Sequence, residues 1–74
     1  MARAYLLKFL DSQERAVREL KIEADDEQSA ITYSCEQSVR FGMAVELCCE
    51  DMSILRVTPM TARLYLPDRE WSRA

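Results

Sequence analysis

One central stretch most constrains the fold: DDEQSAITYSCEQSVRFG, in which both ends of an amphipathic helix are encoded. Asp25 is a suitable N-cap, and Gln28, three residues later, completes a pattern like a capping box. Gly42, the only glycine in the chain, can adopt the left-handed conformation that closes a helix. The sequence therefore predicts one helix at about residues 25–41.

The predicted helix has a narrow inward face. At 100° per residue, one stripe gathers small and apolar side chains: Ala30, Ile31, Ser34, Cys35, Ser38 and Phe41. Small side chains favour close packing against a sheet. The opposite side carries Tyr33 and Arg40, two turns apart. Tyrosine and arginine are common interface anchors, so both are candidate interface residues, although a single exposed aromatic residue is also ordinary.

Two strand patterns precede the helix. Residues 5–10 carry apolar side chains on both faces, which indicates a central or interface strand. A polar turn follows at residues 11–14. Residues 16–24 then alternate, so that Leu20 and Ile22 face inward and the charged side chains face outward.

A second hairpin follows the helix, because residues 43–49 again alternate with a period of two. A three-residue turn at residues 50–52 would join apolar partners: Cys49 with Ser53, Leu47 with Leu55, and Val45 with Val57. A two-residue turn would oppose Val45 to Arg56, so we reject it. The predicted fold is α+β, in the order ββαββ, with an antiparallel sheet packed on one helix.

The C-terminal stretch allows two interpretations. Thr58 and Pro59 are suited to an N-cap and first helical residue, yet the following residues also alternate like a strand. We favour an extended arm over residues 59–74 with a mobile tail, after a ββαββ domain at residues 1–58. The arm has apolar side chains to place, and these are further candidate interface residues: Leu64, Leu66 and Trp71.

Length and charge limit the function classes. A 74-residue chain forms one small domain, and its net charge is −3. Residues 22–51 carry eight acidic side chains against Arg40 alone, which argues against nucleic acid as a partner. The sequence contains no apolar run long enough to span a membrane and no signal-peptide core, so we expect a cytoplasmic protein without membrane contact.

The cysteines suggest little chemistry. The chain has no histidine, and Cys35, Cys48 and Cys49 do not have the spacing of a zinc site. Their odd number indicates reduced thiols in the cytoplasm. We expect Cys35 and Cys49 to be buried and Cys48 to be partly exposed, as a candidate reactive thiol. A single glycine excludes a phosphate-binding glycine loop, so we expect no cofactor, no metal and no enzymatic activity.

Three segments carry a resemblance to a group of short uncharacterised bacterial proteins: YLLKFLD, RAVRELKIEADDEQSAI and MAVELCC. In that group a YxLYFLD strand is followed by a turn, a strand ending in DDExAI, a helix and an ELW strand. The similarity covers about residues 4–57. This chain lacks a glycine in its first turn, has Cys48 where an aromatic is usual, and extends past the last strand. The resemblance implies the ββαββ fold and no particular activity.

Our functional expectation is a small interaction module. We expect homodimerisation through a sheet edge or the C-terminal arm, with an unidentified protein as a further partner. The alternative is a small-ligand-binding or regulatory domain with a cleft between sheet and helix.

Overall fold

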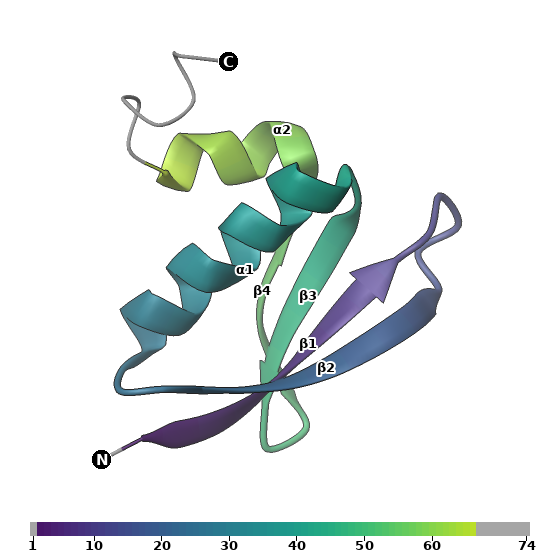
Figure 1. Cartoon of the computed structure of the whole chain (residues 1–74). Coiled ribbons are helices and arrows are strands. Elements are labelled where there is room, and N and C mark those ends of the chain that lie inside the picture. The colour runs from purple at the N-terminus through teal and green to yellow at the C-terminus, as the bar shows by residue number, and fades with distance from the viewer. Residues whose placement is uncertain (1, 67–74) are drawn as a thin grey trace.

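The computed structural model describes residues 2–66 of the chain. Figure 1 shows the elements in the order β1 (Arg3–Leu10), β2 (Ala16–Ala24), α1 (Glu27–Phe41), β3 (Ala44–Cys49), β4 (Met52–Val57), α2 (Pro59–Ala62) and the 3₁₀ turn η1 (Arg63–Tyr65). The predicted ββαββ order and the α+β class are confirmed.

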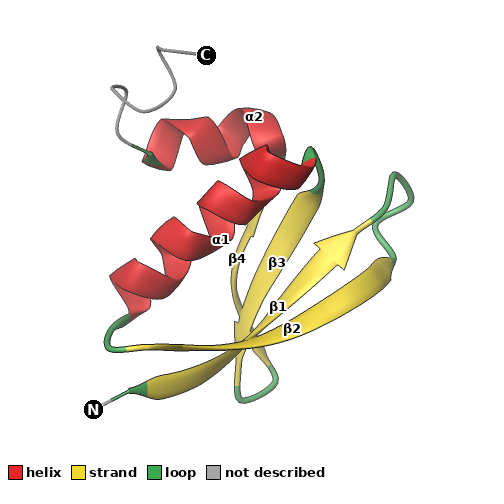
Figure 2. Cartoon of the chain, in the orientation of Figure 1, coloured by secondary structure: helices red, strands yellow, loops and turns green. Residues whose placement is uncertain are grey.

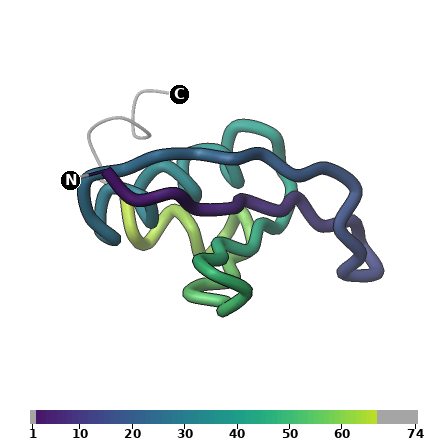
Figure 3. Tube along the Cα trace, turned by 90° about the horizontal axis from the view of Figure 1, so that it is seen from below, coloured from purple at the N-terminus to yellow at the C-terminus, as the bar shows by residue number. Residues whose placement is uncertain are grey.

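The four strands form one antiparallel sheet in the order β2-β1-β3-β4. Both helices lie on the same face of this sheet (Figure 2). The central position of β1 explains why its sequence is apolar on both faces, since it pairs with β2 on one side and with β3 on the other. β1 and β2 run side by side along their length, and their hairpin projects beyond the rest of the molecule (Figure 3).

The N-cap of α1 is Asp26, so the prediction that Asp25 caps the helix with Gln28 is wrong by one residue. Asp26 has an extended backbone, and its carboxylate accepts a hydrogen bond of 2.7 Å from the backbone N–H of Ser29. The acidic run offers several suitable cap residues, which is why sequence alone misplaced the start. The end is as predicted, because Gly42 is left-handed and its N–H donates to the carbonyl of Ser38.

The small side chains of α1 do face the sheet. Ala30, Ser34, Cys35 and Ser38 are buried, and this face meets the central strands β1 and β3. The buried hydroxyls are satisfied within the fold, because Ser34 donates to the carbonyl of Ala30 at 2.8 Å and Ser38 donates to the carbonyl of Met43 at 2.6 Å. Short side chains therefore let the helix approach the sheet while the hydroxyls of Ser34 and Ser38 both keep a hydrogen-bond partner.

Phe41 departs from the predicted inward stripe, because it remains 52% exposed. Its ring still packs edge-on against the ring of Phe9, with centroids 5.7 Å apart and an interplanar angle of 89°. Phe41 therefore contacts the core through Phe9 while about half of its side chain stays exposed.

The β3–β4 hairpin turns through two residues, so our rejection of a two-residue turn is wrong. Glu50 and Asp51 form the turn with positive φ, and Cys49 pairs with Met52 instead of Ser53. A register shift between Leu47 and Cys48 leaves Ile54 as an extra residue in β4. The bulge restores the two apolar pairs that we predicted, Leu47 with Leu55 and Val45 with Val57.

The C-terminal stretch is helical from residue 59 to residue 65, so the extended arm is wrong for these residues. Thr58 is the N-cap of α2 and forms reciprocal hydrogen bonds with Thr61, as the alternative interpretation required. Ala62 and Leu66 belong to the buried core cluster together with Leu7 and Phe9. Residues 67–74, including the predicted tail, lie outside the described residues.

Candidate functional site

The predicted interface residues do not form one site. Tyr33 and Arg40 are both exposed on α1, as expected from the helical pattern. Leu64 is 83% exposed on η1, whereas Leu66 is only 6% exposed and contributes to the core of its own chain. Leu66 is therefore not available as an interface residue in this structure. Trp71 lies outside the described residues.

The cysteines are placed differently from our expectation. Cys35 and Cys48 are buried, and Cys49 is half-buried, so the predicted burial of Cys48 and Cys49 is reversed. Burial raises the pKa of the Cys48 thiol, with a further contribution from the charge of Glu46. Burial likewise raises the pKa of the Cys35 thiol. Because the thiolate is the reactive form, this environment disfavours the reactivity that we had assigned to Cys48.

The described residues also give no support for a metal centre, since residues 2–66 contain no group of three or more potential His, Cys, Asp or Glu ligands. In the same part of the chain, no helix has the length and apolar character needed to cross a membrane.

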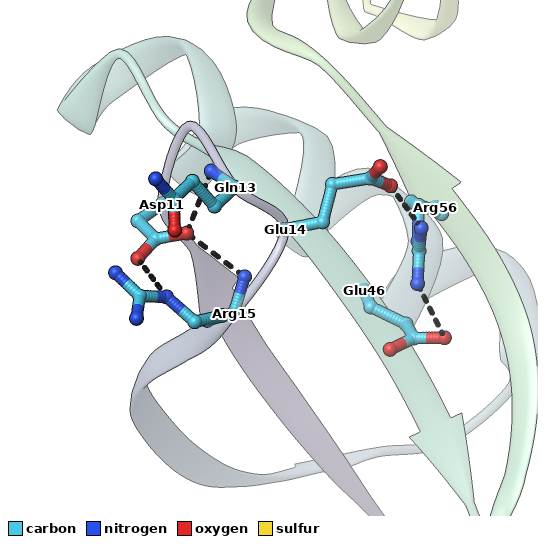
Figure 4. A network of polar contacts seen from close by, with 6 residues as sticks. All are labelled: Asp11, Gln13, Glu14, Arg15, Glu46 and Arg56. Atoms are coloured by element: carbon cyan, nitrogen blue, oxygen red, sulfur yellow. Dashed lines mark hydrogen bonds and ion pairs between the residues drawn. The ribbon is translucent and has the colours of Figure 1, made fainter.

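A cleft of about 670 Å³ lies at one end of the sheet, where the β1–β2 turn, the α1–β3 connection and the end of β4 meet. Its apolar lining includes Leu10, Met43 and Val57. Figure 4 shows the polar rim, in which Arg56 lies between the carboxylates of Glu14 and Glu46. This cleft is not the space between sheet and helix in which we expected a ligand, and ligand binding stays a prediction.

The β1–β2 turn beside this cleft is organised by Asp11. Its carboxylate accepts hydrogen bonds from the backbone N–H groups of Gln13 at 2.8 Å and Arg15 at 2.9 Å, and from the Arg15 guanidinium at 3.1 Å. The backbone N–H of Arg15 lowers the pKa of Asp11 most strongly, because it favours the ionised carboxylate. This turn fixes where the long strand β2 begins.

The two edge strands of the sheet differ in regularity. β4 has six residues and is interrupted by the bulge at Ile54. β2 has nine residues, and its only irregularity lies near its start, between the pairs that Arg18 and Ala16 form with β1. Residues 18–24 therefore form a regular stretch whose outer edge pairs with no strand among the described residues. Such an edge is a template for another strand.

The side chains of this regular edge alternate in type. Leu20, Ile22 and Ala24 are half-buried on the helix side of the sheet, whereas Glu19, Lys21 and Glu23 are exposed on the other side. The helix side is itself only partly covered, because Arg18, which pairs with Phe9 on this side, is exposed. Figure 1 shows the reason: α1 starts beside the end of β2 and crosses the sheet away from it, towards β3 and β4.

Our sequence interpretation named a sheet edge as a means of association but no residue on it. The signal was present in the segment ELKIE, where acidic and basic side chains alternate on one face. It could not be used without the strand order, because only the structure shows that β2 is an edge strand.

No protein-family model matches this sequence, and the comparisons with curated proteins and with solved structures also give no match.

Proposed function

We propose that this protein is a small interaction module that forms a homodimer by antiparallel pairing of β2 with β2 of a second copy. The observation that carries the proposal is the regular outer edge of residues 18–24, which pairs with no strand of residues 2–66. Strand addition would supply backbone hydrogen-bond partners to this edge and extend the sheet from four strands to eight.

Charge supports a second copy as the occupant. Arg18 lies near the start of β2, directly after Arg15, which pairs with Asp11, and the residues that follow the other end of β2 are acidic, from Asp25 to Glu27. Antiparallel pairing brings the basic start of each strand towards the acidic end of the other. The same edge therefore carries opposite charges at its two ends, as a self-complementary surface requires.

The same proposal gives the protein a binding role and no catalytic one, in the cytoplasm. All three cysteines are free, which fits a reducing compartment. We also assign the chain to the short bacterial proteins that it resembles, and the observed ββαββ order supports this assignment. We also propose a further protein partner, separate from the second copy. Tyr33 and Arg40 remain the candidate residues for contact with it.

Hydrogen exchange at several protein concentrations tests the proposed dimer. Sedimentation would first determine the association state from about 1 µM to about 1 mM, the range in which small interfaces dissociate. We expect a monomer–dimer equilibrium, with amides of β2 protected in the dimer and exchanging faster after dilution. The amides of β4 are the internal control and should not respond. A monomer at every concentration, or a dimer whose dilution affects β4 and not β2, would refute the proposal.

A further inference from the structure

The alternating charges of β2 restrict how two copies can pair, if they pair through this edge as proposed above. In an antiparallel pair with twofold symmetry, opposite residues lie on the same face of the sheet. An axis between two residues would oppose neighbouring residues of β2, which point to different faces. The symmetry axis must therefore pass through the position of one residue, which then lies opposite the same residue of the second copy. Within residues 18–24 the central candidates are Leu20, Lys21 and Ile22.

A centre at Lys21 uses the whole regular stretch but opposes like charges. It places Lys21 against Lys21 and Glu19 against Glu23, on both sides of the axis. Like charges directly opposite each other destabilise a strand pair. This register is therefore disfavoured, although it would form the longest pairing.

Centres at Leu20 and at Ile22 both give complementary pairs. The first places Glu19 against Lys21 twice, and the second places Lys21 against Glu23 twice. They differ at the next position on the charged face, where a centre at Ile22 opposes Glu19 to Asp25. It also brings the two Asp25 residues to about 20 Å from each other, against about 34 Å for a centre at Leu20. Because both separations exceed the Debye length of about 8 Å at physiological salt, the directly opposed Glu19 and Asp25 are what disfavours a centre at Ile22.

The helix side of the sheet agrees with a centre at Leu20. This register places Leu20 of one copy against Leu20 of the other, and both are half-buried in the single chain. Arg18 would lie opposite Ile22 of the second copy. The guanidinium of Arg18 lies 6.0 Å from the centre of the Phe9 ring, so that Arg18 stands on the same side of the sheet as Leu20 and Ile22.

We propose that two copies pair about Leu20, so that Glu19 of each copy faces Lys21 of the other. The two contacts are related by the twofold axis, and each copy provides the acidic side chain of one contact and the basic side chain of the other. The partner that fits this edge is thus a second copy of the same segment, in one register.

Charge reversal tests this register. Glu19→Lys and Lys21→Glu should each weaken the homodimer by roughly tenfold to a hundredfold, because each change creates two pairs of like charges across the axis. An equimolar mixture of the two variants should form a heterodimer with about the affinity of the unaltered chain, since Lys faces Glu at both contacts. Glu23→Lys is the matched control, because it reverses a charge on the same face outside the proposed pair. Sedimentation measures the affinity of the three variants, of the mixture and of the unaltered chain. Circular dichroism verifies that each variant is folded.

The outcomes separate the register from the dimer itself. A homodimer that is strengthened or unchanged by Glu19→Lys, which would then face Asp25, but weakened by Glu23→Lys would assign the centre to Ile22 and overturn this inference, while the proposed dimer would stand. Folded single variants that are weakened but are not restored by mixing would also overturn it. An unaltered chain that stays monomeric would refute the proposed function first.

Discussion

The two hairpins of this protein reach a similar local solution in different ways. Both turns use non-glycine residues with positive φ: Glu14 at 63° in the first hairpin, and Glu50 at 52° and Asp51 at 67° in the second. Both hairpins also contain a register shift. The first turn is held by the hydrogen bonds of Asp11, whereas the second is a two-residue turn with φ positive at both central positions, as in the type I′ turns that suit twisted strands.

The position of the register shift separates the two hairpins in function. In β4 the bulge at Ile54 divides a short strand, and such an interruption discourages pairing with another chain. In β2 the shift lies at the start, so a regular stretch remains. The outer strands also differ in burial, because β4 contributes the buried Val57 to the core whereas no residue of β2 is fully buried. The central strands β1 and β3 therefore both supply the core, and β2 presents a regular edge.

The largest expected effect tests this division of roles. Leu47→Ala should destabilise the fold by about 3–5 kcal/mol, because Leu47 is 0% exposed and its removal leaves a cavity. Leu20→Ala should cost only about 1 kcal/mol, since the half-buried side chain loses less contact with the core and solvent can fill the space. Urea denaturation at low micromolar concentration measures both losses. Equal losses would show that the edge strand β2 supports the core as much as the central strand β3 does.

The sequence was sufficient to predict the four strands, the long helix α1 and their order. Alternation with a period of two and a helical stripe of small residues are local signals, and they identified all four strands and α1. The register of the second hairpin was less accessible. Two positive-φ residues without glycine and one extra residue at Ile54 compensate for each other, and neither leaves a mark in the hydrophobic pattern.

The errors in the candidate site have one physical cause. Leu66 and Cys48 were assigned to the surface because local alternation was read without the contacts that α2 and the sheet make. Leu66 is buried because the capping hydrogen bonds between Thr58 and Thr61 turn the chain back towards α1. Long-range contacts of this kind decide burial at the end of a small domain, and they are not encoded in residue spacing.

A smaller effect distinguishes the two turns. Asp51→Gly should stabilise the protein by up to about 1 kcal/mol, because glycine adopts positive φ without steric cost. Glu14→Gly relieves the same strain but removes the ion pair with Arg56, a surface interaction typically worth about 0–1 kcal/mol. Its net effect should therefore be close to zero. The urea midpoints of the two variants measure this difference, and an equal gain in both would mean that the Glu14–Arg56 pair contributes nothing.

The smallest effect concerns the pH dependence of the first turn. The folded protein lowers the pKa of Asp11 below the ordinary value of 3.8, mainly through the backbone N–H of Arg15. A lowered folded-state pKa means that the carboxylate stabilises the fold above pH 3.8 and that this contribution is lost as the pH falls through the folded-state value. Asp11→Ala should therefore decrease the Tm at pH 7, and the difference from the unaltered protein should shrink as the pH falls towards about 2.

Asp26, whose pKa is lowered by the backbone N–H of Ser29, titrates in both proteins, so its contribution cancels from the comparison. The remaining difference therefore belongs to the first turn. A decrease in Tm that stays constant from pH 7 to about pH 2 would contradict the role of the Asp11 charge, because an uncharged hydrogen-bond acceptor would not respond to protonation in this way. In that case both turns would depend on backbone geometry alone. The start of β2 would then be fixed without a contribution from the charge of Asp11.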